Sequence, residues 1–220
     1  MSKRQQPSNF NSRFVSIDPV APEQILIRQA AELIKTGRLV AFPTRALYGI
    51  GADIYQPDAV SRVFQAKRRA ADKPVSVLIR SEAQLNELAD DIPETARRLM
   101  HRFWPGLITL VFAAGPNVPL ALTGNTGKIG IRMPAHPVAD ALLAELTHPI
   151  TGTSANLSGE PGCAQISELA LDVANKMAMI LDAGPLAGGA GSTVVDVTAD
   201  PPVVLREGGV SEIDILNSLK

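Results

Sequence analysis

Apolar positions along the chain alternate between helical and strand spacing, which predicts helices and short strands in turn. The segment after Pro22 repeats apolar residues three and four positions apart and is followed by Gly37, as in an amphipathic helix. A second helix is expected over residues 57–67 and a closing helix from Ser211. Because tight hairpin signals are scarce, we expect an α/β fold, a single domain in which helices cover one twisted mixed sheet.

Short apolar runs predict the strands of this sheet. The expected strands cover residues 39–43, 75–79, 108–114, 128–132, 179–182, 192–198 and 201–207, and another runs from Pro149 into a polar turn. Residues 84–89, 93–104, 137–147 and 166–177 are expected as further helices, and residues 45–56 as a glycine-containing loop. Within 128–132, Ile129 and Ile131 point to one face of the strand and Lys128, Gly130 and Arg132 to the other.

The composition is that of a globular protein without a strong overall charge. Hydrophobic residues make up 45% and charged residues 20% of the 220 positions, which is enough for a full core. Lys and Arg number 21 against 22 Asp and Glu, so an anion-binding site must be local. The single cysteine, Cys163, suits a reducing compartment such as the cytoplasm, and its thiol is expected to be packed.

The first fifteen residues differ in character from the rest of the chain. Residues 1–15 are polar and mildly basic, and we expect a flexible tail there, with one domain over residues 16–220. No apolar run approaches the length of a membrane span, so no membrane contact is expected.

The densest cluster of charge lies in residues 66–74. It contains Lys67, Arg68, Arg69, Lys73 and Asp72. Lys67 and Arg69 are two positions apart, so they share a face where the helix has ended, and Pro74 favours such an end. Two interpretations stay open for the cluster taken alone: an anion site, or a solvated helix end whose cations complement the helix dipole.

Further polar residues stand where apolar strands end, and side chains from such ends converge in open α/β sheets. They are Arg132, Ser154, Asn156 and Arg206. Each has a structural alternative, because Ser154 or Asn156 can cap a helix and Arg206 can pair with a carboxylate. Cations gathered in one place repel each other, so together they indicate a polyphosphate such as a nucleotide. The histidines show no metal-ligand spacing, so no metal site built by the protein is expected.

Seven segments, in this order, resemble the YrdC/TsaC family of threonylcarbamoyl-AMP synthases in its short bacterial form. They are FPTRALYGIGAD, AKRRAADKP, FWPGLITLVF, IGIRMPAHP, TGTSANLSG, GSTVVDV and VVLREGGVS. The resemblance covers about residues 20–212, and the pairing of Lys-x-Arg with Ser-x-Asn is its most specific mark. It implies a YrdC-like fold, similar to that of dihydroxybutanone-phosphate synthase, with a concave basic cavity.

The resemblance also implies a nucleotidyltransferase reaction and the residues that serve it. L-threonine, bicarbonate and ATP, with Mg²⁺ carried on the ATP, would give threonylcarbamoyl-AMP and pyrophosphate. The adenylate would pass to proteins that form threonylcarbamoyladenosine in tRNA, with a possible contact to tRNA itself. ATP would be bound by Lys67, Arg69, Lys73, Ser154, Asn156 and Arg206, and Lys67 and Arg69 would be catalytic. Threonine would be bound by Thr44, Tyr48, Arg132 and Ser192.

The sequence departs from many relatives beside these positions. Arg45 and Ala46 stand where relatives have Asp-Thr, and Leu78 stands where they have histidine, which removes a polar contact on the threonine side. Two other hypotheses stay open. One is an RNA-binding module that uses the basic cavity without catalysis, which steep salt dependence without ATP turnover would reveal. The other is a catalytically silent relative that binds nucleotide.

Overall fold

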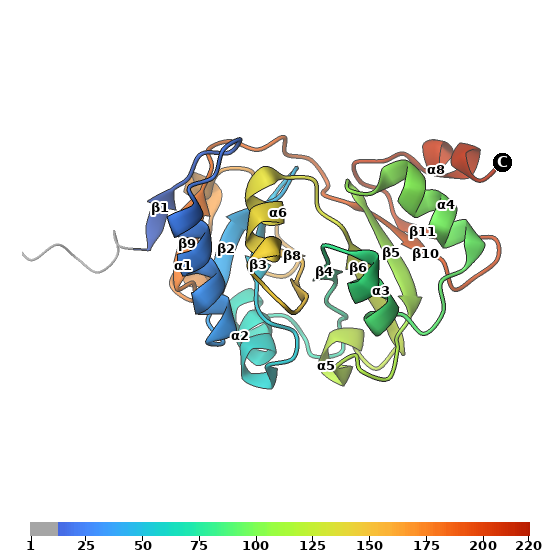
Figure 1. Ribbon diagram of the computed structural model, residues 1–220, viewed down its shortest axis with the longest axis horizontal. Coiled ribbons are helices and arrows are strands. Elements are labelled where there is room, and N and C mark those ends of the chain that lie inside the picture. Colours follow the sequence, from blue (N-terminus) through green and yellow to red (C-terminus); the bar gives the residue numbers. More distant parts are fainter. Residues whose placement is uncertain (1–12) are drawn as a thin grey trace, which may run out of the picture.

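The computed structural model describes residues 13–220, and within them the strands form two mixed sheets. The first sheet has the order β1 (Phe14–Ser16), β9 (Met179–Asp182), β2 (Val40–Pro43), β3 (Tyr48–Gly51), β8 (Thr153–Ser154). The second has the order β11 (Val203–Arg206), β10 (Thr193–Asp196), β5 (Ile108–Ala113), β6 (Lys128–Arg132), β4 (Val77–Leu78), β7 (Ile150–Thr151). Figure 1 shows the first sheet on the left and the second on the right.

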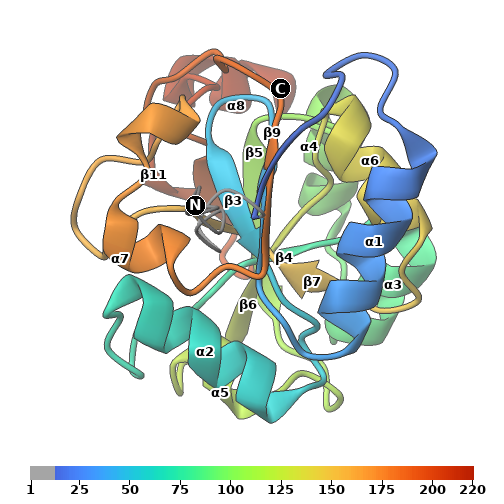
Figure 2. The same cartoon turned by 90° about the vertical axis from the view of Figure 1, so that its left-hand side faces the viewer.

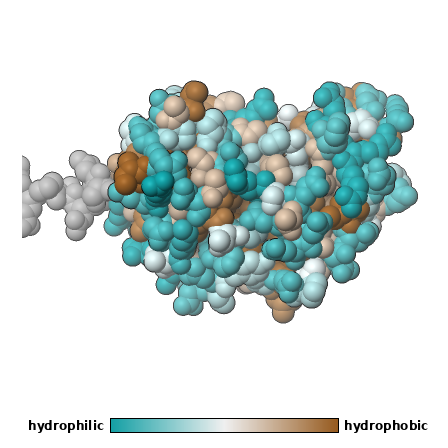
Figure 3. All heavy atoms as spheres, viewed as in Figure 1, coloured by the Kyte–Doolittle hydropathy of each residue, from teal (hydrophilic) through white to brown (hydrophobic). Residues whose placement is uncertain are grey.

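Helices pack around both sheets. They are α1 (Gln24–Lys35), α2 (Pro57–Lys67), α3 (Glu82–Leu88), α4 (Glu94–Phe103), α5 (Leu120–Thr123), α6 (Pro137–Ala144), α7 (Leu171–Ala174) and α8 (Glu212–Ser218), with a 3₁₀ turn over Ile166–Glu168. Among the described residues, no helix combines the length and apolar character that crossing a membrane requires. The face seen in Figure 3 is largely hydrophilic, and its hydrophobic atoms lie in small groups.

The first sheet is covered by helices on both faces, because its strands are apolar on both sides. In β2, Val40 and Phe42 belong to the same core cluster as residues of α1 and α6, whereas Ala41 packs with residues of α2 and α7. In β9, Leu181 joins the first cluster and Ile180 the second. Figure 2 shows α1 and α6 on one side of these strands and α7 on the other.

The second sheet packs its apolar face against α3, α4 and α8. Ile108, Leu110 and Phe112 of β5 share one core cluster with Ile129 and Ile131 of β6. Since successive side chains of a strand point to opposite faces, the residues between them face away from this core. The same alternation that builds the core therefore presents a second, more polar face.

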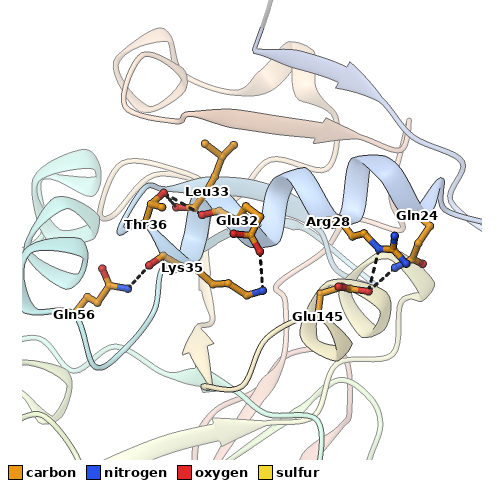
Figure 4. Close-up of polar contacts among 8 residues, drawn as sticks. All are labelled: Gln24, Arg28, Glu32, Leu33, Lys35, Thr36, Gln56 and Glu145. Carbon is orange, nitrogen blue, oxygen red and sulfur yellow. Dashed lines mark hydrogen bonds and ion pairs between the residues drawn. The ribbon is translucent and has the colours of Figure 1, made fainter.

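Helix α1 is tied to its neighbours at both ends (Figure 4). Near its beginning, Gln24 Nε2 donates to Glu145 Oε1 at 2.6 Å, and Arg28 Nε lies 3.8 Å from the same oxygen. Near its end, Gln56 Nε2 donates to the carbonyl oxygen of Lys35 at 2.9 Å. These contacts fix α1 against the end of α6 and the segment that leads into α2.

The two sheets meet where the chain leaves β3. Asp53 forms an isolated bridge with Ile150 of β7, and the Thr151 N–H donates to the carbonyl oxygen of Ala52 at 2.9 Å. The Asp53 side chain accepts hydrogen bonds from the Tyr55 N–H at 2.9 Å and from Gln56 Nε2 at 3.2 Å, and lies 2.9 Å from His148 Nδ1. We call this junction the seam.

The structure differs from the sequence-based expectations in several places. The α/β class is confirmed, but two sheets replace the expected single sheet. The expected loop over residues 45–56 contains β3, whose glycines admit close neighbours: a Cβ on Gly51 would lie 2.9 Å from the Phe42 ring. The helix expected over residues 166–177 is broken into a 3₁₀ turn and α7. Residues 14 and 15, expected in the tail, belong to β1, and residues 1–12 lie outside the described part.

Candidate active site

The polar face of the second sheet forms the floor of a cavity of about 830 Å³. This volume falls within the roughly 300–1,000 Å³ that small-molecule sites occupy. Thr109 and Val111 of β5 and Lys128, Gly130 and Arg132 of β6 line it, as strand alternation requires. The other wall comes from the loop before β3, the end of α2, the segment after β8 and the glycine-rich segment before β10.

Positive charge dominates the lining. Among residues 13–220, five cationic side chains and one carboxylate, that of Glu160, line the cavity. The cations are Lys67, Arg69, Lys128, Arg132 and Arg206. Lys128 Nζ pairs with Asp196 Oδ2 at 2.7 Å, which neutralises that one cation locally. The remaining excess of positive charge makes the cavity suited to an anion.

The end of α2 turns Lys67 and Arg69 toward the same wall. The helix ends at Lys67, and Arg68 adopts the left-handed conformation with φ of 49°. This turn sends Arg68 into solvent, where its Nη2 contacts Asp172 Oδ2 at 2.5 Å, while Lys67 and Arg69 line the cavity. The helix has therefore ended before Arg69, which is the condition under which Lys67 and Arg69 were expected to share a face.

Lys67 holds the Ser154–Asn156 segment in place. Its side chain is 2% exposed, and Nζ donates to the carbonyl oxygens of Ser154 at 2.5 Å and Asn156 at 2.9 Å and to Asn156 Oδ1 at 3.2 Å. The Ser154 hydroxyl donates to Asn156 Oδ1, and Asn156 Nδ2 donates to the carbonyl oxygen of Glu160 at 2.6 Å. Burial, together with the nearby Arg69 charge, lowers the pKa of Lys67 to about 8.

Arg69 lies beside this segment and is half-buried. Its Nη2 donates to the carbonyl oxygen of Pro74 at 2.7 Å, and its Nη1 donates to Ser158 Oγ at 3.4 Å. Burial lowers the pKa of the Arg69 guanidinium. Because Pro74 and Ser158 line the cavity too, Arg69 bridges the α2 end and the segment after β8.

Arg132 is the most buried arginine of the lining, with 8% of its surface exposed. Its Nε donates to the carbonyl oxygen of Gly106 at 2.8 Å, while Nη2 is buried without a partner among the described residues. Burial, with the Arg45 charge as a smaller cause, lowers its pKa to about 10. A buried donor without an acceptor costs about 1–3 kcal/mol, and a bound carboxylate would supply the acceptor.

Hydroxyl groups and Arg206 line the cavity on the β10 side of Arg132. Thr109 Oγ1 and Ser192 Oγ are 2.7 Å apart, and Arg206 Nη2 donates to the carbonyl oxygen of Ser192 at 2.7 Å. Asp196, on the strand next to that of Arg206, pairs with Lys128. A Cβ on Gly208 would lie 2.6 Å from the Ser192 backbone, so glycine is needed for this close approach.

Thr44 and Tyr48 line the cavity, but their hydroxyls bond to the protein. Thr44 Oγ1 donates to the carbonyl oxygen of Leu47 at 2.6 Å. The Tyr48 hydroxyl lies 2.7 Å from the carbonyl oxygen of Gly184 and accepts from the Ala183 N–H at 3.0 Å, and burial raises its pKa. These bonds shape the wall rather than offer free polar groups.

The comparisons agree with this architecture. A family model described as "Telomere recombination", for Sua5, YciO and YrdC proteins, matches residues 32–208. The chain belongs to the Sua5/YciO/YrdC family. The resemblance seen in the seven sequence segments is thereby confirmed.

Two relatives and one solved structure illustrate the range of this family. The threonylcarbamoyl-AMP synthase of Pyrococcus abyssi is 45% identical over 188 residues, which are 86% of this chain and 55% of that protein. The putative threonylcarbamoyl-AMP synthase of Mycobacterium tuberculosis is 41% identical over 198 residues, 89% of this chain and 91% of that protein. The crystal structure of P. abyssi Sua5 complexed with L-threonine matches with a TM-score of 0.89 at 41% identity, covering 93% of this chain and 60% of that one. This chain thus spans little more than half the length of its P. abyssi relative.

Most of the sequence-predicted site residues of this family member come together in the cavity. Those that line it are Thr44, Tyr48, Lys67, Arg69, Arg132, Ser154, Asn156, Ser192 and Arg206. Lys73 is exposed and is not among the described residues that line the cavity; its carbonyl oxygen accepts from Arg69 Nε at 3.4 Å. Cys163 is packed in the core beside the first sheet, where burial raises the pKa of its thiol to about 11.

Sequence reasoning missed Lys128 and Thr109 as lining residues. The alternation within residues 128–132 had placed Lys128 on the face of Arg132, so its signal was present. Thr109 carried no comparable signal, because it stands within an apolar run. No group of three or more His, Cys, Asp or Glu side chains suited to a metal ion occurs among the described residues.

Proposed function

We propose that this chain is a threonylcarbamoyl-AMP synthase, which forms threonylcarbamoyl-AMP and pyrophosphate from L-threonine, bicarbonate and ATP. The observation that carries the proposal is the convergence of cations from separate segments on one cavity, among them the buried Arg132 with an unpartnered Nη2. The names of the P. abyssi and M. tuberculosis relatives and the L-threonine complex of P. abyssi Sua5 support it.

The reaction has two steps. The threonine amine condenses with bicarbonate to give a carbamate and water. A carbamate oxygen then attacks the α-phosphorus of ATP, and pyrophosphate leaves. No covalent protein intermediate is needed, so the task of the protein is to position the reactants, exclude water and neutralise the developing charge.

The ATP side of the cavity is formed by the α2 end and the segment after β8. Arg69 and Arg206 hold the phosphates, and Ser154 and Asn156 bind the nucleotide. Lys67 contributes positive charge and keeps the Ser154–Asn156 segment in shape, since its three donors bond to that segment. Lys73 is exposed and does not line the cavity, so we assign it no contact with ATP. Mg²⁺ arrives as part of the ATP substrate.

The threonine side is the floor of the second sheet. Arg132 binds the carboxylate, which provides the acceptor that its guanidinium lacks within the described chain. Ser192 contacts the amino acid from β10, and Thr44 and Tyr48 shape the opposite wall. The product then passes to proteins that transfer the threonylcarbamoyl group to tRNA. The alternative of an RNA-binding module draws no support here, because Lys67 and Arg132 are buried and cannot reach an RNA backbone.

Pyrophosphate release tests the proposal directly. The chain is incubated with ATP, Mg²⁺, bicarbonate and L-threonine, and reactions without bicarbonate or without threonine serve as controls. We expect release that requires both compounds and is lost in Arg69→Ala, with Lys73→Ala as the matched control that retains most of it. Nucleotide binding without threonine-dependent release would contradict the synthase and favour a silent nucleotide-binding relative.

A further inference from the structure

A row of four side chains crosses the cavity floor at right angles to the strands. The parallel pairing of β4 with β6 sets Leu78 beside Arg132. In the antiparallel pairing of β5 with β6, Leu110 lies opposite Ile131. One residue further along the same register, Thr109 lies opposite Arg132, on the side away from Leu78. Val194 of β10 pairs with Thr109. All four of these floor residues line the cavity.

The chemistry of the row changes from one strand to the next. Arg132 is flanked by an apolar side chain, Leu78, and by a hydroxyl group, that of Thr109, which lies 2.7 Å from Ser192 Oγ. Neighbouring strands are about 4.8 Å apart, so both flanking groups lie within reach of a small molecule held by Arg132.

Leu78 is held firmly in this position. It is 1% exposed, and a Cβ on Gly152 would lie 2.8 Å from Leu78 Cγ and Cδ2, so the glycine lets the leucine pack closely against the backbone. A buried leucine that lines a cavity presents a fixed apolar surface to whatever occupies that cavity.

We infer that Leu78 determines amino-acid specificity by packing against the methyl group on Cβ of the substrate, while Thr109 and Ser192 meet its hydroxyl group. The inference rests on the proposed function in one respect: Arg132 holds the substrate carboxylate. With the carboxylate fixed, the two substituents on Cβ diverge toward the two flanking groups of the row. Threonine carries one methyl and one hydroxyl and suits both sides, whereas serine leaves Leu78 uncovered and valine brings a methyl group in place of a hydroxyl to the Thr109–Ser192 pair.

The contribution of Leu78 has a physical limit. One methyl group in an apolar contact discriminates between substrates by about 10- to 200-fold. We therefore expect a preference of threonine over serine within this range, of which Leu78 supplies the larger part.

The test compares threonine and serine in the Leu78→Ala variant. Pyrophosphate release gives kcat/KM for each amino acid, and calorimetry gives the affinity for each without turnover. We expect the threonine-to-serine ratio to fall about tenfold or more, through a higher KM for threonine, while the KM for serine stays the same. Leu205→Ala is the matched control, since Leu205 lines the cavity from β11, beyond the opposite end of the row from Leu78, and is expected to leave the ratio unchanged.

Two further variants keep the test decisive. Leu78→Val removes one methylene and preserves a strand residue, so it should fold where Leu78→Ala does not, and we expect a smaller fall in the same ratio. Thr109→Val is expected to reduce the preference of threonine over valine and to leave the threonine-to-serine ratio above that of Leu78→Ala.

Different outcomes overturn different statements. Threonine-dependent release with an unchanged threonine-to-serine ratio in both Leu78 variants would overturn the role of Leu78 and leave the synthase intact. Calorimetric binding of threonine with the expected loss in the variants, but without pyrophosphate release, would overturn the synthase and keep the role of Leu78. Absence of threonine binding in the unaltered chain would overturn both.

Discussion

Lys67 shows how one buried charge can serve both architecture and binding. Its ammonium group has three carbonyl or amide acceptors, all from the segment that carries Ser154 and Asn156. Its pKa lies about 8 instead of 10.5, chiefly because of burial and then because of Arg69. Below pH 8 the charged Lys67 therefore lowers the free energy of unfolding of the chain. This destabilisation is lost as the pH rises from about 8 toward 10.5, the pKa of lysine in the unfolded chain.

We predict that ATP affinity falls as the pH rises above about 8. The triphosphate favours the protonated lysine, so binding weakens when the free protein loses this proton, by up to about tenfold per pH unit. Calorimetric titration with ATP between pH 7 and 10 measures the profile. Lys67→Arg, which stays charged over this range, is expected to flatten it, and Lys73→Arg is the matched control that should not. An unchanged affinity across the range in the unaltered chain would refute the role of the Lys67 charge.

At the scale of single elements, the alternation in β6 and the end of α2 do most to position the site. The sequence predicted the bounds of α2 as the structure has them, because proline starts this helix and a cluster of cations ends it. It also predicted which residues of β6 share a face. It missed β3, because glycines such as Gly49 and Gly51 are typical of loops. In this strand a glycine is needed because Phe42 and Ile150, from other parts of the chain, approach the backbone of Gly51 too closely for a side chain.

The left-handed turn at Arg68 leads to a prediction for the end of α2. A non-glycine residue in this conformation costs roughly 1–2 kcal/mol, and the exposed ion pair with Asp172 contributes about 0–1 kcal/mol. Since glycine also makes the unfolded chain more flexible, we expect Arg68→Gly to be about 0.5–1 kcal/mol more stable than Arg68→Ala. Urea unfolding of both variants measures the difference, and ATP affinity should be retained in each. A less stable glycine variant would show that the turn is not strained.

At the scale of the whole molecule, the cavity depends on how the two sheets are held together. The floor belongs to the second sheet and much of the opposite wall to elements around the first, so the distance between them is set by the seam. The buried carboxylate of Asp53 accepts hydrogen bonds from Tyr55 and Gln56 in the seam and contacts His148 there.

We predict that Asp53→Ala destabilises the fold by about 1–3 kcal/mol, because the partly buried N–H groups of Tyr55 and Gln56 lose a charged, buried acceptor. His148→Ala removes a half-exposed partner of the same carboxylate and should cost within about 1 kcal/mol. Urea unfolding measures both. We also expect a lower kcat/KM in Asp53→Ala, since the two walls are less firmly joined. Equal stability of Asp53→Ala and the unaltered chain would show that the seam does not depend on this residue.

The amino-acid sequence by itself determined the kinds of element, the faces of the strands and the segments that carry the cations. These properties follow from local spacing, because apolar and polar positions record which side of a helix or strand is buried. Only the tertiary structure decided that the strands divide into two sheets, that the polar face of the second sheet forms a cavity floor, and that Leu78, Arg132 and Thr109 lie in one row. Strand partners and register depend on contacts between residues far apart in the chain, and local spacing carries no record of them.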